Sequence, residues 1–123
     1  MEAGKPMRES LDEFAKALVE QARDEAIREC DMCARPGAPN PIARRWSALG
    51  VDARAFEVLI PDIVDQAVSS LLRAVDQEVL KLKVQTKDGS ELDLVEVSRD
   101  GALVGWYYAV WRVAFSRERH FEP

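Results

Sequence analysis

Two cysteines three positions apart are the first residues in this chain whose types and spacing could do chemistry. Cys30 and Cys33 form a Cys-x-x-Cys pair, a spacing used by zinc sites and by redox-active thiols. A zinc site takes about four ligands, yet the one histidine, His120, is far away in sequence. A redox pair normally begins a helix, where the helix dipole lowers the thiol pKa, whereas this pair ends a predicted one. We expect a structural or incidental pair and assign no metal ligand; a metal or disulfide shared between two chains, and redox chemistry, are the alternatives.

The densest aromatic cluster lies near the C-terminal end and comprises Trp106, Tyr107, Tyr108 and Trp111, with Phe115 beyond it. Such side chains most often fill a core, but they also form interaction hot spots and ligand pockets. One helix cannot bury all of them on a single face, so we expect some to be exposed. As the functional assignment, we predict that Trp106, Tyr107, Tyr108 and Trp111 bind a protein partner.

Basic side chains occur in two groups that could together bind an anion. Arg44 and Arg45 precede Trp46, and a second group follows near the C-terminal end: Arg112, Arg117, Arg119 and His120. Guanidinium groups bind phosphate and carboxylate through paired hydrogen bonds. No glycine-rich phosphate-binding motif accompanies them, so we expect solvated surface charges and assign no cofactor.

Four carboxylates lie on a predicted long central helix: Asp62, Asp65, Asp76 and Glu78. Metal-assisted hydrolysis would require several of them to converge in a pocket. Asp62 and Asp65 follow Pro61, where acidic residues favour a helix start, and the lone histidine argues against a Ser-His-Asp triad. We assign no catalytic residue. The alternative is a small enzyme or ligand-binding protein with a carboxylate and aromatic pocket between the central and last helices.

The composition is typical of one ordinary globular domain. The chain has 123 residues, of which 47% are hydrophobic and 32% charged, as in average domains. Its net charge of -5 argues against nucleic acid and anionic membranes as partners, because both attract cationic surfaces. An acidic surface can instead speed association with a basic protein. Because no long apolar run suggests a signal peptide or membrane span, we expect a cytoplasmic protein.

Two helices are predicted in the first half of the chain. Ser10 and Glu13 form a capping box for a helix that reaches about Cys33. The predicted solvent-facing side of this helix includes Arg23 and Asp24. The apolar positions on its inward side are Leu11, Phe14, Ala15, Leu18, Val19, Ala22, Ala26 and Cys30. After a connector rich in proline and glycine, Asn40 caps a short helix over residues 42–49 with Pro41 at its first position, and Gly50 ends it.

The central helix, residues 52–80, carries a wide apolar stripe at steps of three and four, which predicts burial along much of its length. Asp52 is its expected N-cap, and Pro61 either kinks it or begins a second helix. The stripe consists of Phe56, Leu59, Ile60, Ile63, Val64, Ala67, Val68, Leu71, Leu72, Val75 and Val79.

The sequence period changes to alternation at Leu80, which predicts a strand over residues 80–85. Asp88-Gly89 marks a hairpin turn, and residues 91–98 read as the return strand, with a bulge near Leu94-Val95 to repair their faulty alternation. This register pairs Val84 with Leu94, Leu82 with Val95 and Leu80 with Val97. A last helix spans Leu103 to about Phe115.

Together these elements predict an α+β fold: a single small domain whose helices, one long and buried, pack on an antiparallel β-hairpin in the order α-α-α-β-β-α. The domain covers residues 10–116, between a flexible N-terminus (1–9) and a flexible charged tail (117–123). The expected core comprises Leu18, Phe56, Ile60, Ile63, Ala67, Leu71, Leu82, Val84, Trp106 and Val110.

Our functional expectation is a non-catalytic protein-interaction module that binds a protein partner or a second copy of itself as a homodimer. The small size, acidity, helices and single hairpin make the chain similar in type to bacterial immunity or antitoxin proteins. That likeness implies an acidic inhibitor or immunity-type factor with a basic partner and carries no site residue.

Overall fold

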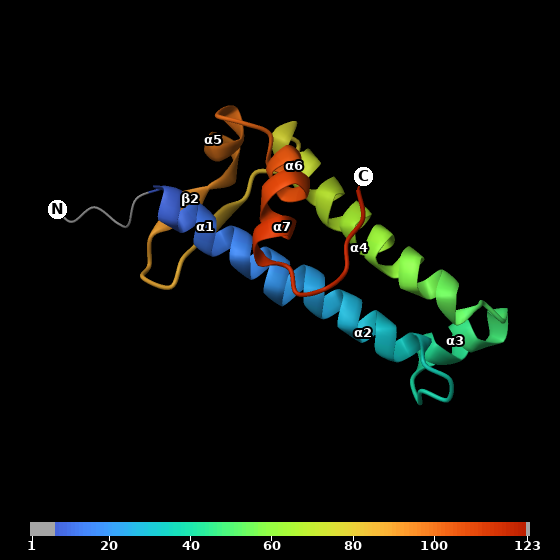
Figure 1. The fold of residues 1–123 in the computed structure, drawn as a ribbon. Coiled ribbons are helices and arrows are strands. Elements are labelled where there is room, and N and C mark those ends of the chain that lie inside the picture. Colours follow the sequence, from blue (N-terminus) through green and yellow to red (C-terminus); the bar gives the residue numbers. More distant parts are fainter. Residues whose placement is uncertain (1–6, 123) are drawn as a thin grey trace.

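The chain folds as an α+β domain, in which two long helical rods run antiparallel and a two-stranded sheet lies near one end (Figure 1). The computed structural model describes residues 7–122. The last helix contacts both rods, and the chain beyond it returns between them (Figure 1). Within the described range, no helix has both the length and the apolarity to cross a membrane.

The first rod consists of α1 (Met7–Ala17), a π-helical segment η1 (Leu18–Arg23) and α2 (Asp24–Ala34). The prediction that Ser10 begins this helix is wrong, because α1 already includes Met7 and Ser10 is buried inside it. Part of the predicted flexible N-terminus, residues 1–6, lies outside the described residues.

The π-helical turn of the first rod changes which residues face inward. Ala15, Val19 and Arg23 are buried at steps of four, whereas Ala22 is exposed. A π-helix forms i→i+5 hydrogen bonds and so holds more residues per turn than an α-helix, which keeps positions four apart on one face. The prediction that Arg23 and Asp24 face solvent is therefore wrong, since both are fully buried.

The caps predicted for the next two helices are confirmed. The Asn40 side chain accepts a hydrogen bond from the Ala43 N–H at 2.8 Å and begins α3 (Pro41–Leu49). Gly50 ends α3 with a φ of 65°, a left-handed conformation that glycine adopts without steric cost. Asp52 then caps α4 (Ala53–Asp76), a single helix that runs through Pro61.

The wide apolar stripe of α4 divides into two faces. Ile60, Leu72 and Val75 are buried against the rest of the chain. Ile63, Ala67 and Leu71 are exposed, so their prediction as core residues is wrong. The stripe is wider than the face that the neighbouring elements cover, which a hydrophobic pattern alone does not reveal.

The sheet is a hairpin of β1 (Lys83–Gln85) and β2 (Glu91–Asp93) in which Val84 pairs with Leu92. The predicted return strand is wrong beyond Asp93, and so is its register, because residues 94–99 form helix α5 (Leu94–Arg99). The Asp93 carboxylate accepts a hydrogen bond from the Val95 N–H and caps this helix. Leu94, Val95 and Val97 broke the strand alternation because they are buried on a helix.

The last helix combines α6 (Leu103–Trp106), a second π-helical segment η2 (Tyr107–Trp111) and α7 (Arg112–Phe115). The N–H groups of Leu103 and Val104 donate to the Asp76 carboxylate at 2.8 and 3.1 Å, so the end of α4 fixes the start of α6. Leu103, Tyr107 and Trp111 are buried at steps of four, whereas Val110, predicted in the core, is exposed.

The core lies where the first rod, α4, the hairpin, α5 and the last helix meet. Of the remaining predicted core residues, Ile60 is buried and five are partly buried: Leu18, Phe56, Leu82, Val84 and Trp106. The buried cluster itself consists of Ala15, Val19, Leu72, Val75, Leu92, Leu94, Val95, Val97, Leu103, Tyr107 and Trp111.

Candidate functional site

A buried carboxylate, Asp65, joins the three main helical elements. It accepts hydrogen bonds from Arg23 Nε at 2.6 Å, Arg112 Nη1 at 2.7 Å and the Tyr107 hydroxyl at 2.5 Å. Arg23 comes from η1, Asp65 from α4, and Tyr107 and Arg112 from the last helix. We call Arg23, Asp24, Asp65, Tyr107 and Arg112 the buried ion network; all five side chains are nearly inaccessible to solvent.

The Arg23 guanidinium extends the network to the C-terminal tail. It donates to Asp24 at 2.8 Å, to Ser116 Oγ at 2.9 Å and to the Arg119 carbonyl at 2.9 Å. Asp24 accepts two further bonds, from Ser116 Oγ and the Arg117 N–H. Two arginines therefore face two aspartates, and the buried charges balance, as burial of ions requires.

The network holds its groups in fixed ionisation states. Burial alone would raise the pKa of the Asp65 carboxyl, but the bonds from Arg23, Tyr107 and Arg112 outweigh burial and hold its pKa below the usual range. Burial and the bond to Asp65 both raise the pKa of the Tyr107 hydroxyl. A carboxylate whose lone pairs are already shared among three donors is a poor proton acceptor, so this arrangement stabilises a fold rather than transferring protons.

We expect Tyr107 to remain protonated above pH 10, the ordinary pKa of tyrosine, until the protein unfolds in alkali. Because its pKa is higher in the folded than in the unfolded chain, its stabilising contribution is complete below about pH 10 and is lost as the pH rises above that value. Ultraviolet titration of tyrosinate, taken as the difference between wild type and Tyr107→Phe, isolates this group, and Tyr108→Phe is the matched control. A Tyr107 midpoint near pH 10 in folded protein would contradict the prediction.

The structure places the predicted aromatic site mainly inside the chain. Tyr107 and Trp111 are buried, and Trp106 and Tyr108 are partly buried. Phe14 meets Trp111 edge to face, with ring centroids 6.0 Å apart. The Tyr108 hydroxyl donates to Ser69 Oγ at 3.0 Å, and the Arg112 guanidinium lies 4.6 Å from its ring centre. The partner-binding assignment is therefore corrected for Tyr107 and Trp111, whose side chains a partner could not reach in this fold.

The other sequence candidates do not converge. Arg112 is buried on Asp65 and Arg119 binds Asp31, so the expected group of basic residues with Arg44 and Arg45 is split among different partners. Cys30 and Cys33 are free, partly buried thiols, and burial raises the pKa of Cys30. No three His, Cys, Asp or Glu residues within 7–122 are grouped as metal ligands would be.

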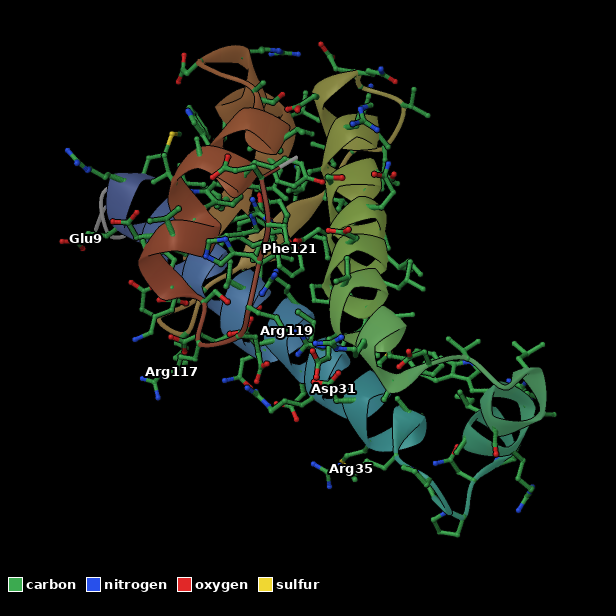
Figure 2. All side chains as sticks on the ribbon, turned by 45° about the vertical axis from the view of Figure 1, so that its right-hand side comes forward. Glu9, Asp31, Arg35, Arg117, Arg119 and Phe121 are labelled. Carbon is green, nitrogen blue, oxygen red and sulfur yellow. The ribbon has the colours of Figure 1, made fainter. Side chains whose placement is uncertain are left out.

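Residues 117–122 form no helix or strand, yet side chains of this segment are bonded to both rods. Arg119 makes a bidentate ion pair with Asp31 at 2.8 and 2.9 Å (Figure 2). The Nε of Arg119 also donates to the Glu57 carbonyl at 2.7 Å. In a regular helix the Glu57 carbonyl would accept from the N–H of residue 61, but Pro61 has none. Arg119 thus supplies the hydrogen bond that Pro61 cannot, a contact that the expectation of a flexible tail did not include.

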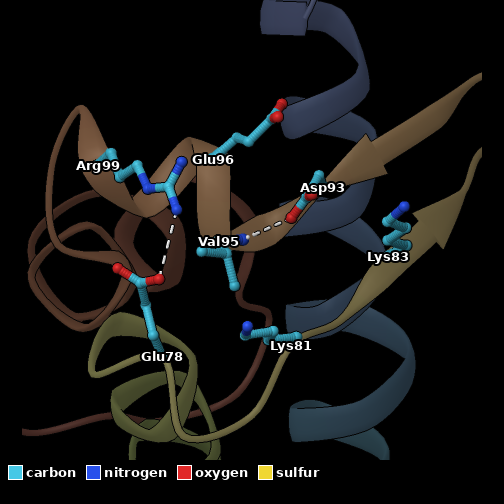
Figure 3. Close-up of a pocket in the computed structure, with 7 residues that line it drawn as sticks. All are labelled: Glu78, Lys81, Lys83, Asp93, Val95, Glu96 and Arg99. Carbon is cyan, nitrogen blue, oxygen red and sulfur yellow. Dashed lines mark hydrogen bonds and ion pairs between the residues drawn. The ribbon is translucent and has the colours of Figure 1, made fainter.

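An open groove of about 430 Å³ lies between the end of α4, β1 and α5. Figure 3 shows Arg99 facing Glu78, a pair 3.3 Å apart, and Asp93 turned toward the Val95 N–H. Acidic and basic groups both line it: Glu78, Lys81, Lys83, Asp93, Val95, Glu96 and Arg99. Small-molecule sites are usually apolar with a few convergent polar groups, whereas six of the seven residues that line this groove are charged.

Sequence reasoning missed the buried ion network because it rests on two π-helical turns. The available signal was the step of four from Ala15 through Val19 to Arg23, repeated from Leu103 through Tyr107 to Trp111. Comparison with known proteins adds no functional information: the chain has no significant match to a family model, to a curated protein or to a solved structure.

Proposed function

We propose that this chain is a non-catalytic protein-interaction module whose contact surface is the outer face of α4. The observation that carries the proposal is an exposed apolar stripe of Leu59, Ile63, Ala67 and Leu71, which we call the outer stripe. Leu59 is 46%, Ile63 63% and Leu71 44% exposed. Apolar residues aligned along three helical turns form a continuous patch, unlike the scattered apolar residues normal on a surface.

The alternative, a small enzyme with a carboxylate and aromatic pocket, has less support. Asp65, Tyr107 and Tyr108 do lie together between α4 and the last helix, but their polar atoms bond to one another and to neighbouring side chains. The grooves described in this structure are lined by other residues. A reacting group would need space beside such a carboxylate.

The narrower form of the proposal is an acidic inhibitor or immunity-type factor that binds a basic protein in the cytoplasm. Its support is the net charge of -5, which would speed association with a cationic partner and make the rate sensitive to salt. The free thiols of Cys30 and Cys33 suit a reducing compartment.

We expect Ile63→Glu to abolish the interaction and Val113→Glu to preserve it. Ile63 lies on the outer stripe, whereas Val113 on α7 is 66% exposed and lies on a different helix, so both variants should fold. A charge placed within an apolar contact should weaken binding by about tenfold or more. The measurement is affinity capture of tagged protein from its native cells, with every bound chain, including untagged copies of the protein itself, quantified by mass spectrometry. Equal capture by both variants would contradict the proposal.

A further inference from the structure

We infer that the outer stripe is covered by α4 of a second copy of this chain, which lies antiparallel across a two-fold axis at Ala67. This inference rests on the proposed function and names its partner. The first rod, α5 and the last helix pack on the opposite side of α4 (Figure 1), and α3 packs near its N-terminal end, where Trp46 stacks on Phe56. From Ile63 to Leu71, the outer side of α4 has no covering element among residues 7–122.

The outer stripe is complementary to itself when reversed. Ile63 and Leu71 lie four residues before and after Ala67. A two-fold axis at Ala67 therefore places Ile63 of each chain beside Leu71 of the second copy, and the two Ala67 residues against each other. A small residue at the crossing point allows close approach of the two helices, with the larger side chains interlocking on either side. A two-fold interface requires this self-complementarity.

Two charges decide in favour of the antiparallel arrangement. Asp62 and Arg73 are eleven residues apart, close to three helical turns, so they lie on the same flank of α4. Both residues are exposed, and neither forms an ion pair within the described chain. Because they lie five residues before and six after Ala67, the reversed copy brings Asp62 beside Arg73 twice. In a parallel pair the two-fold axis runs along the helices and places these two flanks on opposite sides of the interface, so neither charge would meet an opposite charge.

Exposed apolar residues also lie just beyond both ends of α4. Val79, just beyond the C-terminal end of α4, is 79% exposed, and Leu49 and Val51, just before its N-terminal end, are also exposed. In the antiparallel arrangement each Val79 approaches the Leu49 and Val51 end of the second copy. These residues would add apolar area to the contact beyond the outer stripe.

Sedimentation equilibrium of purified protein tests this arrangement through a charge exchange. Asp62→Arg and Arg73→Asp should each raise the dimer dissociation constant by about tenfold, because each places like charges together twice. The double variant, which restores opposite charges, should return the constant to within about threefold of the wild-type value. Ile63→Glu should leave a monomer, and Val113→Glu should dimerise as wild type does. Circular dichroism confirms that each variant is folded.

A second measurement locates the axis. In a Cys30→Ala, Cys33→Ala background, Ala67→Cys should form an interchain disulfide under mild oxidation, whereas Val113→Cys should not. Any of three results would overturn the inference. The wild type could be a monomer at about 100 μM, Ile63→Glu could leave the dimer unchanged, or the double charge variant could keep a raised dimer dissociation constant. If the protein is monomeric but Ile63→Glu still abolishes capture of another protein, this inference fails and the proposed function stands. If neither self-association nor capture depends on Ile63, both fail.

Discussion

Asp65→Asn is expected to lower the free energy of unfolding by about 3–5 kcal/mol, the usual effect of removing one partner from a buried ion pair. Asp65 accepts from both Arg23 and Arg112, so the neutral amide leaves the two buried guanidiniums with Asp24 as the remaining anion of the network. Asparagine has nearly the same volume, and the loss therefore reports on charge and hydrogen bonding rather than on a cavity. Urea unfolding at low protein concentration measures it without a contribution from subunit dissociation.

The matched control is Asp62→Asn, which removes an exposed carboxylate from the same helix and should change stability by no more than about 0.5 kcal/mol. The two variants should also differ in acid. The pKa of Asp65 is lower in the folded chain, so its contribution is complete above about pH 3.9, the unfolded value, and is lost as the pH falls through the folded pKa. Asp65→Asn should therefore lack part of the acid destabilisation of wild type. If Asp65→Asn lowers the free energy of unfolding by less than about 1 kcal/mol and leaves the acid dependence of stability unchanged, the network is not stabilising.

Arg23→Lys should destabilise the fold by roughly 2–4 kcal/mol although it retains the positive charge. The guanidinium of Arg23 donates to Asp65, Asp24, Ser116 and the Arg119 carbonyl from its three nitrogens. An ammonium is a single point with three donors and cannot span these acceptors. At least one or two charge-assisted hydrogen bonds are lost, each worth about 1.5–3 kcal/mol.

Arg28→Lys is the control for this substitution, because Arg28 lies on the same rod, is exposed and pairs with Glu25 within one helical turn. The Arg28→Lys substitution should leave the free energy of unfolding nearly unchanged, as for most surface ion pairs. The Arg23→Lys variant should also loosen the tail, since Arg23 holds Ser116 and Arg119. Limited proteolysis within residues 117–122 reports on that change, and equal stability of Arg23→Lys and Arg28→Lys would refute the role given to the guanidinium.

Much of the fold was accessible from local sequence signals. Asn40 before Pro41, Gly50 and Asp52 are interpretable one residue at a time, because a cap or a left-handed turn depends on the residue that occupies it. The change of period at the hairpin identified the α+β class. The return strand was wrong because Leu94 and Val95 are adjacent apolar residues, which both a bulge and a helix can accommodate.

The site was not accessible in the same way. The step of four from Val19 to Arg23 hinted that Arg23 lies inside, but an unpaired arginine is normally exposed, and no local period reveals that its partner is Asp65, 42 residues away. Nor could the width of the α4 stripe show which half is covered within the chain. Ile60 and Ile63 are equally apolar, and their different burial follows from the tertiary arrangement alone.

The two π-helical segments also have a consequence for how the length of this chain can change in evolution. Each i→i+5 turn contains about one residue more than an α-helical turn. Deleting one residue from 18–23 would therefore return the first rod to a continuous α-helix. The wider turn absorbs the extra residue, so after such a deletion the residues that follow, Asp24 among them, would keep nearly the orientation relative to Ala15 and Val19 that they have now. Exposed loops normally absorb insertions and deletions. In this chain, relatives of different length should therefore vary in the connector at residues 35–40 and also, by one residue, in the two π-helical turns.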